Sequence, residues 1–427
     1  MRSVTHSSGN SWCPSDSGTH SDAHDRRTTV EPTREVTMNQ ARDALYRRVR
    51  RWTSGYTSLW FNASGNPPLH LRSFSRQEQC EREKQVDVMR REGSLSPTGG
   101  SASERGQGRK RIMALIAQGI PGPAGVRVRR FLDHCGRAGE RFVGRARSFN
   151  AGISDAEIQQ ALRNLWVFNS LQFYLGKPVV LTPSSFAYSL LYPYTDNWLD
   201  ETAETCQGKQ SLVRWLTSQL HGYPSSTDDG RKEAIASLLR MIRQEFPRSR
   251  RPEVHASLLA IHRAQKKALR LCGAPSTGSE HSLIPLTMEK GGTSVLVDGL
   301  LAGRLSTAQA EAIFGYGILL QLVDDLQDLQ EDLDGSRSSP FSRAIRHGTL
   351  EGVTNRLFNL TEVIAARLKR EGLPASGDIA PLIARSCTIL IEEAIARHSH
   401  LYRQGYLALV NRHTPVRLAY LREFRHR

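Results

Sequence analysis

The sequence predicts an all-α fold, a single large helical bundle with a central apolar cavity. Three observations predict it. From Arg111 onward, apolar residues recur at three-to-four spacing, as on one face of a helix. Helix-capping residues precede several of these segments. No convincing stretch alternates apolar and polar residues as a half-buried strand does. The number of such segments predicts a core larger than that of a four-helix bundle.

The first 110 residues differ from the rest and are predicted to be a low-complexity, disordered leader to the helical domain at 111–427. They contain the stretches "SVTHSSGNSWCPSDSGTHSD" and "GSLSPTGGSASERGQGRKR", which lack the apolar periodicity that orders a backbone. Met38 is a second candidate start of the protein. We therefore expect the fold to be built without this region.

The helical elements can be placed in order from their end signals. Ser154 and Glu157 form a capping box, and Gly176 is placed to end the helix that follows. Pro183 suits the first position of the next helix, which reaches Asp196 after a predicted kink at Pro193. Further helices are predicted at about 230–246, 253–271, 293–303, 307–334, 354–370 and 379–411.

Composition and charge exclude several classes of protein. No apolar run in the 427 residues approaches the ~20 needed to span a bilayer. The six cysteines are scattered, without a C-x-x-C pair or a zinc-type cluster, which indicates a reduced, cytoplasmic protein. The net charge of +16 is spread along the chain without stacking aromatics, so no specific nucleic-acid binding is expected.

The stretch "YPYTDNWLDE" (192–201) places two carboxylates on one helical face. Asp196 and Asp200 are four residues apart, so they lie one turn above the other. Two like charges at this spacing repel each other, and a bound cation would compensate them. The alternative is that both side chains face water.

A second acidic turn lies at 315–335, in "GYGILLQLVDDLQDLQEDLDG". Ser306 and Gln309 form a capping box that begins its helix. The inward face of this helix carries apolar residues first and acidic residues further along. Burying these carboxylates is unfavourable unless they bind a metal. Mg²⁺ uses few carboxylates and completes its coordination with water and phosphate oxygens. This face consists of Phe314, Gly317, Gln321, Asp324 and Asp328, with Asp325 beside it.

These segments carry a resemblance to a known family. "FGYGILLQLVDDLQDLQED" resembles the second aspartate-rich motif of trans-prenyl diphosphate synthases, and "DNWLD" resembles the first motif, with Asn197 where an aspartate is usual. Over roughly residues 150–427 the chain resembles class I isoprenoid synthases. The resemblance implies a bundle of isoprenoid synthase type, and a cluster of two or three Mg²⁺ ions held by Asp196, Asn197, Asp200, Asp324, Asp325 and Asp328.

The resemblance also implies contacts to a substrate diphosphate. "MEKGGTSVLVDGLLAG" is similar to the Lys-Thr segment of prenyl synthases, which assigns Lys290 and Thr293 to the diphosphate, with Gly291 and Gly292 permitting close approach. The alternative is an exposed lysine before a helix. Gln321 belongs to the second motif. The remaining candidates are Arg343 and Arg346 in "FSRAIRHG", which would close over the anion or belong to a basic surface loop.

The implied reaction is the Mg²⁺-dependent ionisation of an allylic prenyl diphosphate above an apolar, aromatic-lined cavity. The Arg-Arg pair that usually follows the first motif is absent, and only Lys209 is near. The G-K-x-x-R segment for isopentenyl diphosphate is missing as well. A terpene synthase is therefore favoured over a chain-elongating prenyltransferase. A non-catalytic prenyl-diphosphate-binding homologue and a helical scaffold are further alternatives.

Two expectations concern partners. Prenyl synthases are commonly dimers, so the resemblance implies a homodimer. The basic amphipathic C-terminus "RLAYLREFRHR" could contact anionic lipid as a peripheral membrane segment, or it could be a solvated helix end.

Overall fold

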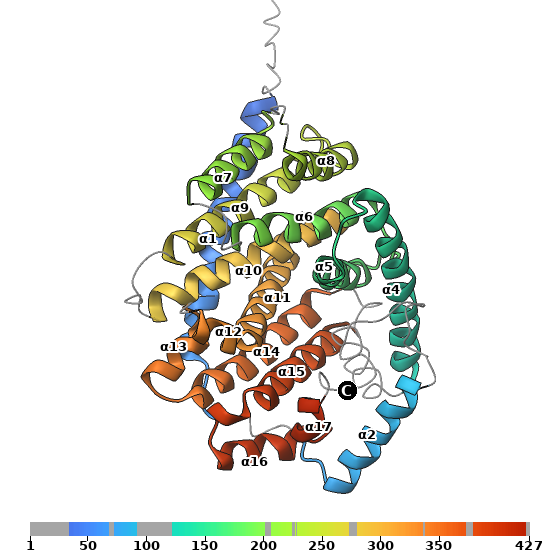
Figure 1. The fold of residues 1–427 in the computed structure, drawn as a ribbon, viewed down its shortest axis with the longest axis vertical. Helices are drawn as coiled ribbons and strands as arrows, with labels where there is room; N and C mark the ends of the chain where they lie inside the picture. Colours follow the sequence, from blue (N-terminus) through green and yellow to red (C-terminus); the bar gives the residue numbers. More distant parts are fainter. Residues whose placement is uncertain are drawn as a thin grey trace, which may run out of the picture.

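The computed structural model describes most of the chain as packed helices. It describes residues 34–67, 72–91, 122–200, 206–223, 227, 229–272, 280–335, 338–372 and 379–423. No β-strand occurs within these ranges, which confirms the predicted all-α class. The helices, drawn in Figure 1, are α1 (Arg34–Asn62), α2 (Arg76–Arg91), α4 (Gly122–Phe149), α5 (Asp155–Tyr174), α6 (Pro183–Asp200), α7 (Cys206–His221), α8 (Gly230–Glu245), α9 (Pro252–Cys272), α10 (Glu280–Ala302), α11 (Thr307–Gln327), α12 (Leu329–Asp334), α13 (Pro340–His347), α14 (Leu350–Glu371), α15 (Ile379–Arg397), α16 (Gln404–His413) and α17 (Leu418–Arg422), with a 3-10 turn at Ser399–Leu401.

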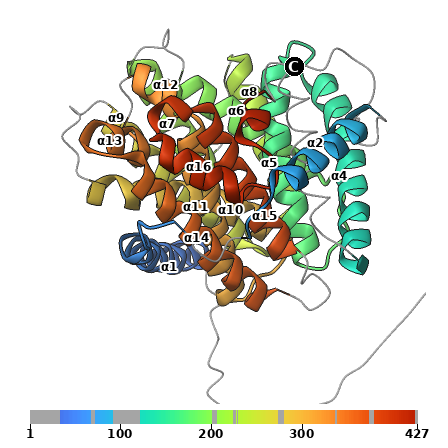
Figure 2. The same ribbon diagram turned by 90° about the horizontal axis from the view of Figure 1, so that it is seen from below.

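Helix α10 lies at the centre of the molecule (Figures 1 and 2). It packs extensively against α11 and α9 and also contacts α1 and α5. From Gly291 to Leu301 every residue except Ser294 is buried. A helix that is apolar on all sides removes its side chains from water only when other helices surround it.

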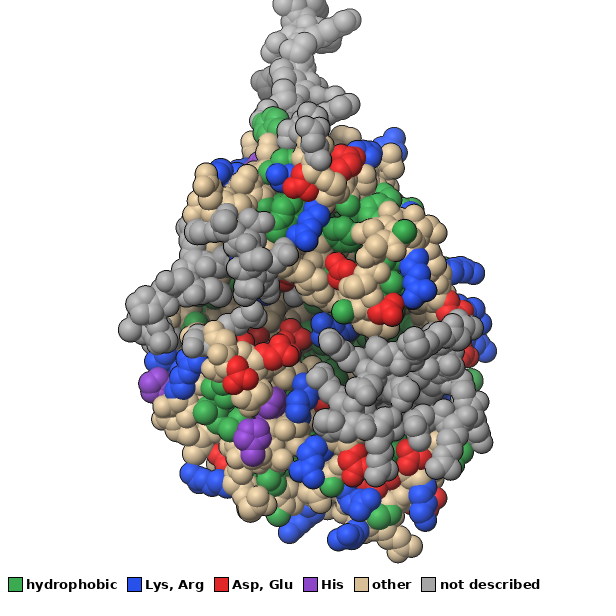
Figure 3. Space-filling model, in the orientation of Figure 1, with side chains coloured by type: hydrophobic (Ala, Val, Ile, Leu, Met, Phe, Trp, Pro, Cys, Tyr) green, Lys and Arg blue, Asp and Glu red, His purple; other side chains and the backbone are tan. Residues whose placement is uncertain are grey.

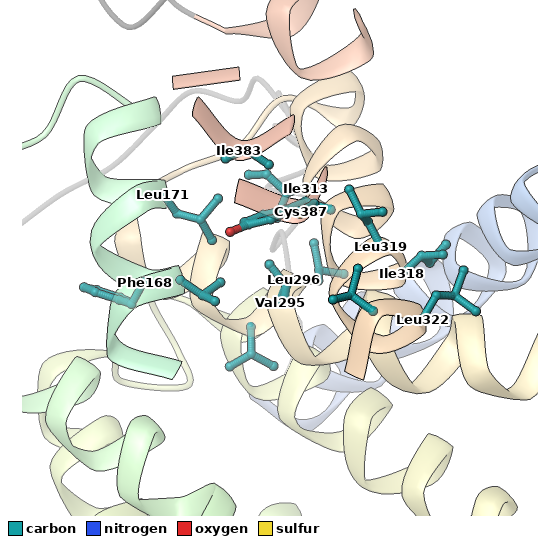
Figure 4. Packing of buried hydrophobic residues seen from close by; sticks show 14 of the residues in the cluster. Phe168, Leu171, Val295, Leu296, Ile313, Ile318, Leu319, Leu322, Ile383 and Cys387 are labelled. Atoms are coloured by element: carbon teal, nitrogen blue, oxygen red, sulfur yellow. The ribbon is translucent and has the colours of Figure 1, made fainter. Parts of the chain in front are cut away.

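The core around α10 is formed by side chains from α5, α11 and α15 (Figure 4). Phe168 and Leu171 approach from α5, Ile318 from α11 and Cys387 from α15, and they meet Leu296 of α10. All five residues are 1% exposed or less. This part of the interior is filled with side chains.

Several predicted helix ends are confirmed. The Ser154 side chain accepts a hydrogen bond from the backbone N–H of Glu157, and the Glu157 carboxylate accepts one from the backbone N–H of Ser154. Ser306 and Gln309 form the same reciprocal pair. Gly176 follows α5 with φ at 64°, a conformation that glycine adopts without strain. Local capping chemistry therefore determined these boundaries.

Other predicted boundaries were wrong. The helix expected at 293–303 begins thirteen residues earlier, because α10 continues through Pro285. The helix expected at 307–334 ends at Gln327, and Asp328 joins α11 to the short α12. The helix expected at 379–411 is divided into α15, a 3-10 turn and α16.

The N-terminal region, predicted to be a disordered leader, contributes two packed helices. Trp52, Tyr56 and Trp60 lie along one stripe of α1, and each is 1% exposed or less. Helix α1 packs on α9 and α10, and the indole Nε1 of Trp60 donates to Glu280 Oε1 at 3.1 Å. The prediction that the fold excludes residues 1–110 is therefore wrong for α1 and α2. The many arginines of α1 make the composition of this segment polar, so its apolar stripe was not recognised in the sequence.

The C-terminal segment packs against α2. Glu83 of α2 binds the guanidinium of Arg417, with Nη2 at 2.5 Å from Oε2, and the hydroxyl of Tyr420 donates to Asp87 at 2.9 Å. Leu418 and Leu421 are buried. The apolar residues that a lipid-binding segment would expose are therefore used within the protein, in the part of this segment that the structure describes.

None of the helices described here has the length and apolar character required to cross a membrane.

We expect Trp60→Ala to lower the free energy of unfolding by about 3–5 kcal/mol, because it removes a buried aromatic side chain from the contact between α1 and the core. Arg51→Ala, at an exposed position of the same helix, should change it by less than about 0.5 kcal/mol. Chemical denaturation measures both. A Trp60→Ala variant as stable as the wild type would show that α1 is not part of the folded core.

Candidate functional site

Helix α6 delivers the first acidic residue, Asp196. Thr182 caps this helix, since its Oγ1 accepts from the backbone N–H of Ser185 at 3.1 Å, and Pro183 occupies the first position as predicted. The Asp196 carboxylate is bound from two other helices. Its Oδ1 accepts from Nε2 of Gln265 on α9 at 2.6 Å, and its Oδ2 lies 3.9 Å from Nζ of Lys290 on α10.

Glycines bring α10 and α11 into backbone contact next to Lys290. A Cβ atom on Gly317 would lie 2.9 Å from the carbonyl carbon of Gly291, and one on Gly292 would lie 2.5 Å from the ring of Phe314. Only hydrogen fits at these positions. The crossing places Lys290 beside the turn of α11 that carries Gln321 and Asp325.

Helix α11 delivers the second acidic turn. Gln321 Nε2 donates to Asp325 Oδ1 at 2.9 Å. Burial raises the pKa of Asp325 to about 8, whereas the bond from Gln321 and the positive charge of Lys290 act to lower it. Lys290 thus interacts with Asp196 of the first acidic turn and with Asp325 of the second. The structure brings the two predicted acidic turns together at this lysine.

The other two acids of the second turn interact with each other. Asp324 is half-exposed, with Oδ1 3.7 Å from Nη1 of Arg163 on α5. Burial, followed by the charges of Asp324 and Glu331, raises the pKa of Asp328 to about 7. Crowded carboxylates that disfavour one another's ionisation would be relieved by a bound cation.

The donor set suits Mg²⁺, although no complete metal cage is formed. Within the described residues, no group of three or more His, Cys, Asp or Glu side chains is arranged to hold a metal ion. Mg²⁺ needs only one or two carboxylates, since water and phosphate oxygens occupy its other positions. Asp324 and Asp328, two neighbouring oxygen donors, fit that requirement, with Asp196 across the site.

Three residues of the predicted Lys-Thr segment, Thr293, Gly291 and Gly292, are buried. Thr293 is fully buried, and its hydroxyl donates to the backbone carbonyl of Glu289 at 2.6 Å, so it has no path to a ligand. Gly291 and Gly292 serve the crossing with α11. From the resemblance, Thr293 was expected to contact the anion and the two glycines to let the backbone come close to it, whereas in this structure all three residues are buried in the helix packing.

The remaining predicted residues are only partly described. Asn197 is exposed on α6. The side chain of Asp200 lies outside the described residues. Arg343 is half-buried and Arg346 exposed on α13, which contacts α10, α11 and α12. Their roles stay predictions.

Two residues of the site were not predicted. Gln265 binds Asp196, and Arg163 pairs with Asp324. Both lie on helices that the periodicity did predict, on the polar side of each. No local signal distinguishes them from ordinary exposed residues, because their partners are distant in sequence.

Asp298, two turns after Lys290 on α10, is a further buried acid. It is 0% exposed, and neither of its oxygens has a hydrogen bond of normal geometry among the described residues. Burial raises its pKa well above the ordinary value, while the amide of Asn164 on α5 acts to lower it. Burial therefore favours the neutral form of this carboxyl group.

The surface around the acidic turns is hollowed, but the predicted central cavity is not confirmed. Figure 3 shows acidic side chains gathered beside a hollow, with basic side chains across from it. Two cavities formed by described residues lie elsewhere. One, of about 320 Å³, is bounded by α1, α9 and α10, and the other, of about 470 Å³, by α14 and α15. Phe168, Phe186 and Tyr188, aromatic residues of α5 and α6, are buried in the packed core.

Comparisons of the chain with protein-family models, with curated proteins and with solved structures found no match.

We expect Gly317→Ala to lower the free energy of unfolding by about 2–3 kcal/mol, because the added methyl group collides with the backbone of α10. Gly136→Ala, in α4, provides the matched control. A Cβ there meets nothing within 4 Å, so its better helix propensity should raise the stability by up to about 1 kcal/mol. Equal effects of the two substitutions in urea denaturation would contradict the close crossing.

A pH-dependent prediction follows from Glu392, which borders the cavity between α14 and α15. Burial raises its pKa to about 8, although Arg385 acts to lower it. The folded state therefore retains a proton that the unfolded state releases near pH 4.5. The contribution of Glu392 is fully present below that pH and declines as pH rises through about 8. Glu392→Gln should match the wild type in acid and exceed it by a few kcal/mol above pH 8.

Urea denaturation of both proteins across this pH range measures the difference. A constant difference at every pH would contradict the shifted pKa.

Proposed function

We propose that the protein ionises an allylic prenyl diphosphate in a Mg²⁺-dependent reaction at the face where α6, α10 and α11 meet. The single observation that carries this proposal is the position of Lys290. Its ammonium group lies 3.9 Å from Asp196 and acts electrostatically on Asp325. Acidic turns about 130 residues apart in sequence thus face each other across one cation, as a shared diphosphate site requires.

The described side chains divide into two chemical roles. Asp196, Asp324 and Asp328 would hold Mg²⁺, which supplies Lewis-acid stabilisation of a departing diphosphate when bound. Lys290 and Arg163 are cationic and border the same acids. They would contact the diphosphate oxygens as the bond between C1 and oxygen breaks and its electron pair leaves with the diphosphate.

The fate of the resulting cation defines the subclass. A carbocation must be kept from water until it loses a proton or is captured. The sequence lacks the second diphosphate site of chain-elongating enzymes, so we propose a terpene synthase-type reaction, with prenyl transfer as the alternative. As in the family it resembles, the protein would act as a homodimer.

A second candidate function is favoured by the filled interior. Phe168, Leu171 and Leu296 occupy the space between α5 and α10 (Figure 4), and no acid of the two turns lines either cavity in the described part of the chain. A protein that binds a prenyl diphosphate without converting it would need the acidic face but not a deep chamber.

We expect purified protein with Mg²⁺ to release inorganic diphosphate from geranyl, farnesyl or geranylgeranyl diphosphate. Asp324→Asn and Lys290→Ala should each lower kcat by about 10²-fold or more, because each removes charge that stabilises the leaving group. Asp334→Asn is the matched control. Its carboxylate, six residues after Asp328, accepts a hydrogen bond from Gln330, and turnover should be unchanged.

Product analysis with and without isopentenyl diphosphate separates the subclasses. A longer chain identifies a prenyltransferase, and a hydrocarbon or alcohol from one substrate identifies a terpene synthase. Tight Mg²⁺-dependent binding without release would support the binding protein. Neither binding nor release with any of the three substrates would refute the proposed site.

A further inference from the structure

A cavity bounded by α1, α9 and α10 has a lining that includes none of the acids of the two turns. We call it the α1 cavity; it has a volume of about 320 Å³. This size is at the lower end for small-molecule sites. Its lining includes Arg50, Thr53 and Ser54 from α1, Arg263 and Lys267 from α9, and Glu289 from α10.

The cavity is separate from the acidic turns, although it shares two helices with them. On α9, Gln265 binds Asp196, whereas Arg263 and Lys267, two residues to either side, line the cavity. Residues two apart on a helix point in nearly opposite directions. On α10, Lys290 serves the acidic turns and its neighbour Glu289 the cavity.

The charge of the cavity favours an anion. Three cationic side chains line it, and Glu289 is the one acid among its lining residues. Both oxygens of Glu289 are bound by Lys267 Nζ, at 2.5 and 2.6 Å. The cation of Arg263 lies over the ring of Tyr46, 4.7 Å from its centre. The charges of Arg50 and Arg263 remain uncompensated within the lining, which matches a phosphate dianion.

A buried hydroxyl group gives independent support for a polar ligand. Thr53 is 7% exposed and lines the cavity, and its Oγ1 has no hydrogen-bond partner among the described residues. Leaving such a group unsatisfied is unfavourable, and because Oγ1 itself has almost no accessible surface, it would bond to a ligand in the cavity only after the side chain rotates about χ1. Ser54 and Thr57 line the same space.

Part of the lining of the α1 cavity is apolar. Val49, Ala260 and Pro285 line the cavity, so it offers contact for a short hydrocarbon group beside the cations. We infer that the α1 cavity binds a small organic phosphate, whose dianion is held by Arg50, Arg263 and the Thr53 hydroxyl and whose short carbon chain packs on α9 and α10.

Isothermal titration of the full-length protein with monobutyl phosphate tests this site. EDTA keeps divalent ions from the acidic turns, and no prenyl substrate is present, so the result is independent of the proposed reaction. We expect saturable binding, at least threefold tighter than that of inorganic phosphate or of butyrate. The butyl group uses the apolar walls, and the dianion uses both uncompensated charges.

Three variants locate the binding. Arg263→Gln should weaken it at least fivefold. Thr53→Val keeps the shape of the side chain and should weaken it at least threefold, with an unfolding midpoint equal to or above that of the wild type. Asp324→Ala should leave it unchanged.

Loss of affinity in Arg263→Gln and Thr53→Val, with affinity retained in Asp324→Ala, establishes the site. Absence of saturable binding would overturn the inference, and the cavity would then hold only water. Unchanged affinity in Thr53→Val, or loss in Asp324→Ala, would overturn it as well.

Discussion

The backbone contact between α10 and α11 is the constraint on which the rest of the structure depends. Gly291 and Gly317 allow the two helices to cross without side chains between them. The neighbouring residues Lys290 and Gln321 are consequently held at fixed positions beside Asp325. A larger residue at the crossing would separate the helices and move the lysine away from the second acidic turn, since packed helices adjust only as rigid units.

The balance of charge at the acidic face follows from this geometry. Asp196 accepts a hydrogen bond from Gln265 and pairs with Lys290, whereas the charges of Asp324 and Asp328 disfavour each other, with Arg163 as the cation near them among the described residues. The protein thus has one acid already compensated and a crowded acidic pair. This asymmetry suits a site that receives a divalent cation together with an anionic ligand, because each reduces the unfavourable charge around the other.

Helix α1 has two roles, one in the core and one in the wall of the α1 cavity. It packs on α9 and α10, and its aromatic stripe belongs to the core. The polar residues between those aromatics line the α1 cavity. One helix therefore stabilises the fold and also creates a cationic space whose other walls, α9 and α10, carry Gln265 and Lys290 of the proposed active site.

The sequence by itself determined the helical class, the caps at Ser154 and Ser306, and the two acidic turns, because these depend on neighbours within a few residues. Tertiary structure decided what the residues face. Thr293 was expected to contact a ligand and is buried with its hydroxyl bound to a backbone carbonyl, and Gly291 lies at the crossing of α10 and α11. Arg163 and Gln265 joined the site from helices without a distinguishing motif. Helix α1 was missed because its arginines outweigh a stripe of three aromatic residues in composition. Burial and long-range contacts are properties of the folded chain, and no local pattern contains them.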